Sequence, residues 1–237
     1  SLSKKLPSAV ITFNPHPRSI VDQDTALFQT LISIEKKIEL LHNFNIDYLW
    51  LLPFNKDVSL IGADKFLSDY IINCFNPKDI IIGYDHRFGN KRKGGKEFLI
   101  KNSKKYNYNL HTMEAVLYNK SPISSSCIRS FLNKGSLSDA NACLGRNYEL
   151  DGRVIKGQGL GKKMGFPTIN IEPFINNQLI PASGVYCVDI KIKKKIYTGM
   201  CNIGVRPTFY KSGKEVIEAH LFTDSMVECY GRDVCIS

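Results

Sequence analysis

The hydrophobic positions follow two different patterns along this chain, and the change between them lies near residue 146. In the first part, short and partly β-branched apolar runs are typical of buried strands, and they alternate with apolar stripes at helical spacing. Strands that alternate with helices predict βαβ units and an α/β fold with a parallel, Rossmann-like sheet. The expected strands are 9–13, 47–52, 79–82 and 109–112, and the expected helices are 33–44, 62–74, 96–106, 127–133 and 137–144.

Helical stripes disappear after residue 146. Short apolar and β-branched runs follow, separated by turns rich in Gly, Pro and Lys. This pattern predicts a small antiparallel β-barrel. We therefore expect one domain over 1–146 and a second over 147–237. The strands expected in the second domain are 148–156, 184–192, 195–203, 216–222 and 232–236.

Polar clusters follow the first and third expected strands. They read NPHPR at 14–18 and GYDHRFG at 83–89. Ligands of parallel sheets bind at the carboxyl ends of the strands, so both clusters are candidate site loops. They can equally be turns, stiffened by proline in one case and permitted by glycine in the other.

Three serines and an arginine mark the start of the helix expected near 127. Ser124, Ser125 and Ser126 precede Arg129 by a few positions. Hydroxyls at such a position commonly cap backbone N–H groups. A helix N-terminus also attracts phosphate, which an arginine in the first turn can grip.

The richest cluster of candidate chemistry is GQGLGKKMGFPTINI at 157–171. Glycines allow close backbone approach to a ligand, and their N–H groups can form an anion-binding concavity. Thr168 and Asn170 would point to one side of an extended segment, where their oxygens could hold Mg²⁺ and the phosphates of ATP. A mobile surface loop is the alternative, and the spacing is not that of a Walker A motif. The expected phosphate contacts in this stretch are Gly157, Gly159, Gly161, Lys162 and Gly165.

Composition limits the choice of function. The chain has 237 residues, 43% of them hydrophobic, and a net charge of +10, which favours polyanionic partners. The densest basic run, 91–105, holds seven basic residues and one acid, and is either a solvated helix face or the fringe of a triphosphate site. A nucleic-acid groove would need more interleaved aromatic residues than Phe98 and Tyr106.

Location and redox state can also be anticipated. No 18-residue apolar run exists, so we expect no membrane partner. The first residues lack the apolar core of a secretory signal. The seven cysteines form no C-x-x-C pair, and we expect them to be reduced, as in a cytoplasmic protein.

The second half resembles riboflavin kinases. GKKMGFPTINI is similar to their G-[KR]-x-x-G-[FW]-P-T-x-N signature, and IEAHL at 217–221 is similar to their E-x-H-L strand. The resemblance implies that Glu218 is the general base, although an alternating E-x-H pattern alone would suit a solvent-facing strand. The stretch 202–209 resembles N-I-G-x-R-P-T-F, which we interpret as structure beside the flavin cleft.

The first half resembles the FAD synthetase (FMN adenylyltransferase) module of bacterial bifunctional riboflavin kinase/FAD synthetases. TFNPHPR resembles T-F-x-P-H-P, and GYDHRFG resembles G-Y-D-F-R-F-G with His86 in place of Phe. SPISSSCIR resembles I-S-S-T-x-I-R, with Ser126 in place of Thr. The resemblance implies ATP and FMN contacts from Asn14, His16, Asp85, Ser125, Ser126 and Arg129.

Two family segments have no counterpart in the sequence given. The family's first strand and His-x-Gly-His loop would precede Val10, and a further helix would follow Ser237. The expectation is thus a synthetase domain without that loop and a kinase domain without that helix.

The resemblance implies an enzyme of flavin cofactor biosynthesis. It would phosphorylate riboflavin to FMN with ATP and Mg²⁺, and then adenylylate FMN to FAD. A riboflavin kinase with an inactive or truncated nucleotidyltransferase domain is the first alternative. A basic nucleic-acid-binding protein is the remote one, and we expect no nucleic-acid partner.

Overall fold

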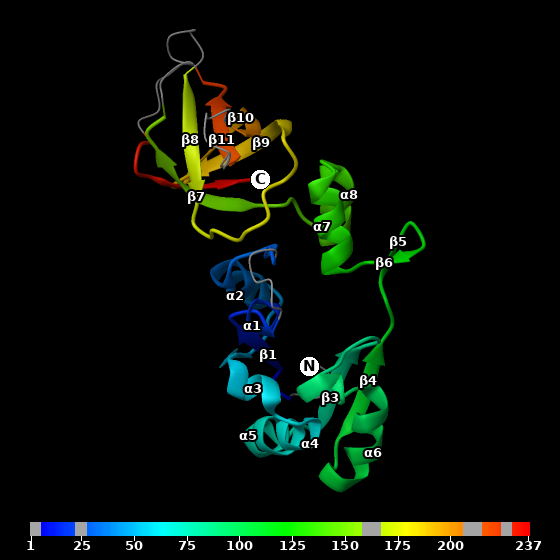
Figure 1. Cartoon of the computed structure of the whole chain (residues 1–237). Coiled ribbons are helices and arrows are strands. Elements are labelled where there is room, and N and C mark those ends of the chain that lie inside the picture. The colour runs from blue at the N-terminus through cyan, green and yellow to red at the C-terminus, as the bar shows by residue number, and fades with distance from the viewer. Residues whose placement is uncertain (1–5, 22–27, 158–166, 206–214, 224–228) are drawn as a thin grey trace. The chain divides into compact units, whose positions relative to one another are not determined.

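The computed structural model describes residues 6–21, 28–157, 167–205, 215–223 and 229–237. The chain forms two compact units. The first contains 1–28 and 37–122, and the second contains 29–36 and 123–237. Figure 1 shows the elements of both.

Parallel strand pairs form the centre of the first unit. β1 (Ala9–Asn14) pairs with β2 (Tyr48–Pro53), and β3 (Asp79–Gly83) pairs with β4 (Asn109–Met113). The predicted parallel α/β fold is confirmed. Within the described residues the pairing takes the form of two separate two-stranded sheets.

The sequence pattern did not predict the short helices at 18–21 and 56–60. The helix expected at 33–44 spans 34–43, and the one expected at 127–133 begins at Ser125. The stripe at 62–74 is not one α-helix, because its central turns, Phe66–Ile72, are π-helical. The α-helices are α1 (Arg18–Val21), α2 (Ile34–Asn43), α3 (Lys56–Leu60), α4 (Ala63–Lys65), α5 (Asn73–Phe75) and α6 (Lys96–Tyr106), and a 3₁₀ turn covers Asn90–Arg92.

A small apolar core joins the π-helical segment, the β3–β4 pair and α6. Leu67 and Leu99 are almost completely buried, and Ile82 and Tyr108 pack with them. The Tyr108 hydroxyl donates to the Leu99 carbonyl at 2.6 Å, so its polar atom is satisfied inside the core. Burial raises the pKa of Tyr108 to about 12.

Two helices precede the barrel. The short hairpin of β5 (Leu117–Tyr118) and β6 (Ser121–Pro122) leads to α7 (Ser125–Asn133) and α8 (Leu137–Leu144). Ser124 caps α7, because its hydroxyl accepts a hydrogen bond from the Cys127 N–H at 3.2 Å.

The predicted antiparallel barrel is confirmed. Six strands close it in the order β10-β11-β8-β7-β12-β9, and every neighbouring pair is antiparallel. β8 did not appear among the expected strands, although Thr168 and Asn170 were expected on an extended segment. The strands are β7 (Leu150–Ile155), β8 (Thr168–Pro173), β9 (Gly184–Ile192), β10 (Lys195–Val205), β11 (Glu215–Leu221) and β12 (Asp233–Ile236).

Alternate residues of these strands fill the barrel. Ile169, Ile171, Ile217 and Ala219 are buried inside, together with aliphatic residues of the other strands. Each buried aliphatic side chain stabilises the fold by about 1.5–3 kcal/mol. A one-residue slip would expose them all, so the interior fixes the register. The residues between them therefore face outward.

A segment from the first half of the sequence belongs to the barrel unit. Thr30 N–H donates to the Asn177 carbonyl at 2.8 Å, and Leu179 N–H donates to the Thr30 carbonyl at 2.9 Å. Lys36 Nζ lies 2.7 Å from Glu149 Oε2. Residues 29–36 are thus fastened to the β8–β9 connection and to the start of β7.

Candidate active sites

Three polar side chains form a row across the outer face of the barrel. Glu218 on β11 lies opposite Asn170 on β8 and opposite Asn202 on β10. Directly opposed residues of antiparallel strands share a face, with Cβ atoms about 5 Å apart. A half-buried carboxylate therefore has a carboxamide on each side.

A second pair of outward-facing residues lies two positions away on the same strands, β8 and β11. Thr168 on β8 is opposite His220 on β11. His220 Nδ1 lies 2.9 Å from the Pro167 carbonyl, which can only accept, so Nδ1 carries a hydrogen and donates it. In the neutral ring, Nε2 is then the acceptor. The ring also meets Phe222 edge-on at 5.9 Å.

The backbone of Gly157 covers one end of the first row. Asn170 is only 5% exposed, although it faces outward. A Cβ at Gly157 would lie 2.1 Å from Asn170 Nδ2, so no larger residue fits without displacing that amide. The close approach here is to the Asn170 side chain, and the predicted approach of the glycine backbone to a phosphate stays a prediction.

The structure thus brings together four of the residues predicted for the kinase site: Gly157, Thr168, Asn170 and Glu218. Gly159, Gly161, Lys162 and Gly165 lie outside the described residues. The oxygens of Thr168, Asn170 and Glu218 are a donor set that suits a hard cation.

The first unit holds Asn14 and His16 at the end of β1. Phe54 N–H donates to the Asn14 carbonyl at 3.3 Å. His16 Nδ1 accepts from the Arg18 N–H at 3.2 Å, which leaves Nε2 as the protonated nitrogen of the neutral ring. That ring stacks on Phe28 with centroids 4.4 Å apart.

Asp85 lies in a braced loop after β3. Phe88 and Gly94 exchange backbone hydrogen bonds of 3.1 and 2.9 Å, and Asn90 N–H donates to the Ile61 carbonyl at 2.7 Å. Burial lowers the pKa of His86, and Arg92 adds to this while Asp85 opposes it.

A series of aromatic ring contacts connects this loop to the end of β1. The Phe66 ring lies 6.2 Å from that of Phe13, which precedes Asn14, and 5.7 Å from that of Phe88. His86 stacks on Phe88 at 6.0 Å. One ring therefore separates the two polar clusters that follow the first and third expected strands.

The basic run divides into two parts. Lys91, Arg92 and Lys93 are exposed at the tip of the Asp85 loop, whereas the later lysines are exposed on α6. Both sequence interpretations therefore have a counterpart: a solvated helix face, and positive charge beside a candidate phosphate site.

Ser125, Ser126 and Arg129 occupy the first turns of α7, in the second unit. Capping falls to Ser124, and the other two serines are exposed. Arg129 Nε donates to the Gln29 carbonyl at 2.7 Å. The backbone of segment 29–36 thus fixes the position of the Arg129 guanidinium, which is a predicted phosphate contact.

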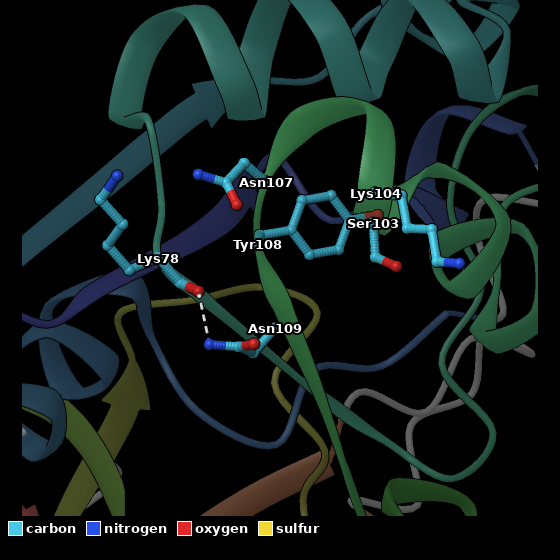
Figure 2. A pocket seen from close by; sticks show the side chains of 6 residues that line it. All are labelled: Lys78, Ser103, Lys104, Asn107, Tyr108 and Asn109. Carbon is cyan, nitrogen blue, oxygen red and sulfur yellow. Dashed lines mark hydrogen bonds between the residues drawn. The ribbon is translucent and has the colours of Figure 1, made fainter.

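A hollow of about 400 Å³ lies elsewhere in the first unit (Figure 2). It opens at the start of β3 and β4, the opposite end from Gly83 and Met113, and Lys78 and Lys104 flank the Tyr108 ring there. The residues that line it are Lys78, Ser103, Lys104, Asn107, Tyr108 and Asn109. None of these is a predicted site residue.

Comparison with known proteins decides the family. A family model for FAD synthetase matches residues 1–127, and one for riboflavin kinase matches residues 144–237. The chain belongs to the bifunctional riboflavin kinase/FMN adenylyltransferase family. The barrel with its Asn–Glu–Asn row lies within the riboflavin kinase match, and Asn14, His16 and Asp85 lie within the FAD synthetase match.

Curated bifunctional riboflavin kinase/FMN adenylyltransferases are similar over most of the chain. The protein of Buchnera aphidicola from Schizaphis graminum is 35% identical, over 91% of this chain and 69% of the relative. That of Bacillus subtilis is 32% identical, over 98% and 73%. That of Escherichia coli K12 is 30% identical, over 98% and 72%.

A solved structure shares the fold. The crystal structure of a macrolide-efflux protein from Streptococcus pneumoniae superposes with a TM-score of 0.87 at 28% identity, covering 99% of this chain and 75% of that one. The efflux description applies to that protein. In the described part of this chain, no helix is long and apolar enough to cross a membrane.

One residue of the outer row was missed by sequence reasoning. Asn202 was interpreted as structure beside the flavin cleft, whereas its position opposite Glu218 places it in the row. Strand parity gives its direction from sequence, but only the register of β10 against β11 shows which residue it opposes.

Proposed function

We propose that this chain phosphorylates riboflavin to FMN and adenylylates FMN to FAD, with ATP as donor in both steps. Membership of the bifunctional family supports both activities. The observation that carries the kinase assignment is the outer face of the barrel. There Glu218 is opposite Asn170, which lies against Gly157, and Thr168 is two residues from Asn170 on the same strand.

In the kinase step, Glu218 is the general base. The ribityl 5′-hydroxyl oxygen attacks the γ-phosphorus of ATP, its proton passes to the carboxylate, and the bond from the γ-phosphorus to the bridging oxygen of ADP breaks. Gly157 and the glycine-rich stretch hold the phosphates through backbone N–H groups. Lys162 adds positive charge.

Thr168 and Asn170 fit a divalent cation. Both offer neutral oxygens on the side of β8 that faces Glu218, and Mg²⁺ prefers oxygen ligands. When bound with ATP, Mg²⁺ would neutralise phosphate charge during transfer. We propose Mg²⁺ because the oxygens of Thr168 and Asn170 are hard donors of the kind that Mg²⁺ prefers.

In the adenylyl step, an FMN phosphate oxygen attacks the α-phosphorus of ATP and pyrophosphate leaves. Asp85, Asn14 and His16 contribute from the first unit. Ser125, Ser126 and Arg129 contribute through the N-terminus of α7, where backbone N–H groups and the guanidinium favour phosphate. The exposed basic tip at 91–93 attracts the anionic substrates.

We propose a synthetase domain over 1–146 and a kinase domain over 147–237. All seven cysteines, each within the described residues, are free thiols. Reduced thiols support our proposal of a cytoplasmic enzyme. Riboflavin, FMN and ATP are the proposed substrates and FAD the final product, with no nucleic-acid or membrane partner.

Product analysis tests this function. The chain is incubated with ATP and Mg²⁺, in one reaction with riboflavin and in another with FMN, and flavins are separated by chromatography. We expect FMN and FAD from the first reaction and FAD from the second. Absence of FMN from the first would contradict the kinase, and absence of FAD from the second would contradict the adenylyltransferase.

A further inference from the structure

Glu218 has one covered side and one open side. On β8, Asn170 is 5% exposed and lies against Gly157. On β10, Asn202 is exposed. Figure 1 shows that β8, β11 and β10 are adjacent strands of the barrel, so the carboxylate stands between two carboxamides in different environments.

The covered side of Glu218 is then the side of the phosphate donor, ATP, and the open side is that of the hydroxyl that accepts the phosphoryl group. The inference rests on the proposed kinase function, which assigns the nucleotide to Gly157, Thr168 and Asn170. Attack in line with the leaving group requires the hydroxyl to approach from the opposite side. That side is β10, where Asn202 is the residue opposite Glu218 and Val185 and Met200 are exposed apolar neighbours on the same face.

We propose that Asn202 is a positioning residue for the general base. Its side-chain N–H donates to one carboxylate oxygen of Glu218 and turns the other toward the acceptor hydroxyl. Such a bond fixes the direction of the free carboxylate oxygen, which must lie within hydrogen-bond reach of the hydroxyl whose proton it takes. Directly opposed side chains are close enough for such a bond.

The backbone gives this amide room to move. Two residues further along the same face, Gly204 has no side chain, and a Cβ placed there would lie 3.8 Å from Asn202 Nδ2. That is ordinary van der Waals contact, so the Asn202 amide lies beside the space above Gly204. Gly204 therefore leaves space beside the Asn202 amide.

Two variants test the proposal in the full-length chain, with riboflavin, ATP and Mg²⁺ as the substrates. Asn202→Ala is expected to lower kcat for FMN formation about tenfold with little change in the KM for ATP, as for a misplaced general base. The KM for riboflavin should also change little, because the residue acts on the base and not on the substrate. Asn202→Asp has nearly the same size but carries no N–H donor, so it should lower kcat at least as far as Asn202→Ala.

Thr198→Ala is the matched control. Thr198 is exposed on the same face of β10 and donates to Asp189, away from Glu218. It should leave kcat unchanged.

Other outcomes overturn the proposal in distinguishable ways. A wild-type kcat in both Asn202 variants would show that the residue does not act on Glu218. A change confined to the KM for riboflavin would assign it to substrate contact instead. If the unaltered chain forms no FMN, the proposed kinase function itself has failed, and the positioning role fails with it.

Discussion

At the scale of single residues, the barrel's outer face combines close packing with chemistry. Asn170 is buried because the backbone of Gly157 lies against it, and His220 is held by the Pro167 carbonyl. Gly157 and Pro167 both belong to the stretch 157–171. The positions of these two residues and the orientation of the Asn170 and His220 side chains are therefore coupled.

This coupling predicts the effect of one methyl group. Gly157→Ala should displace the Asn170 amide, because the added Cβ would lie 2.1 Å from Nδ2. We expect FMN formation to fall about tenfold or more, since misplacement by about 1 Å can cost a hundredfold. Steady-state kinetics measure this.

Gly184→Ala is the control for that variant. Its Cβ would be 3.5 Å from the Tyr186 hydroxyl, an ordinary contact, and kcat should stay within about twofold. Equal kcat in both variants would show that the approach of Gly157 to Asn170 does not matter.

At the scale of elements, sequence reasoning succeeded where the apolar period was clear. β9 and α8 have the predicted bounds. Apolar and charged residues alternate from Val188 to Ile192 in β9, and Gly145 ends α8 in a left-handed conformation. It failed for 62–74, where helical spacing cannot distinguish α-helical from π-helical turns.

β8 and the outer row show a second limit. Thr168 to Glu172 alternate polar and apolar residues, but the alternation covers only five residues and begins directly after Pro167, so the strand signal is weak. The partners of Glu218 depend on register between strands far apart in sequence, which no local pattern encodes. Glu218 itself was found only through the resemblance.

Buried thiols in the strands predict a loss of stability at alkaline pH. Burial raises the pKa of Cys201, which is 2% exposed on β10, from 9.0 to about 11. Between these values the unfolded chain releases the proton and the folded barrel keeps it. The contribution of this thiol to the free energy of unfolding is therefore fully present below pH 9. It is lost as pH rises toward 11, by up to about 1.4 kcal/mol per pH unit.

Urea unfolding from pH 8 to 10.5, followed by far-UV circular dichroism, should show this slope. Cys201→Ala should flatten it, whereas Cys187→Ala, at an exposed position on β9, should not. The same slope in the Cys201 variant would show that this thiol does not contribute.

At the scale of the whole molecule, the boundary between the two family matches differs from the boundaries between the two compact units. Residues 29–36 lie inside the FAD synthetase match, yet they belong to the unit that contains the barrel. The chain therefore passes between the units at 28/29, 36/37 and 122/123.

The ion pair of Lys36 and Glu149 fastens this segment. The side chains are 16% and 22% exposed, and in the described residues no hydrogen-bond donor other than this ammonium reaches Glu149 Oε2. Lys36→Met should lower the free energy of unfolding by about 1–3 kcal/mol, because it leaves a largely buried charge uncompensated.

Thermal or urea unfolding measures this loss, and Lys191→Met, at an exposed lysine on β9, is the control. Adding Glu149→Gln to the Lys36 variant should recover part of the loss. An unchanged stability in Lys36→Met would show that the pair does not hold segment 29–36.

The central claim is that the outer row of the barrel performs riboflavin phosphorylation and takes no part in adenylylation. The most direct test is Glu218→Gln, with Glu215→Gln on the same strand as control, assayed separately with riboflavin and with FMN. We expect Glu218→Gln to lower FMN formation about 100-fold or more, within the range for loss of a general base, and to retain FAD formation from FMN. Equal loss of both activities, or loss of neither, would contradict the account.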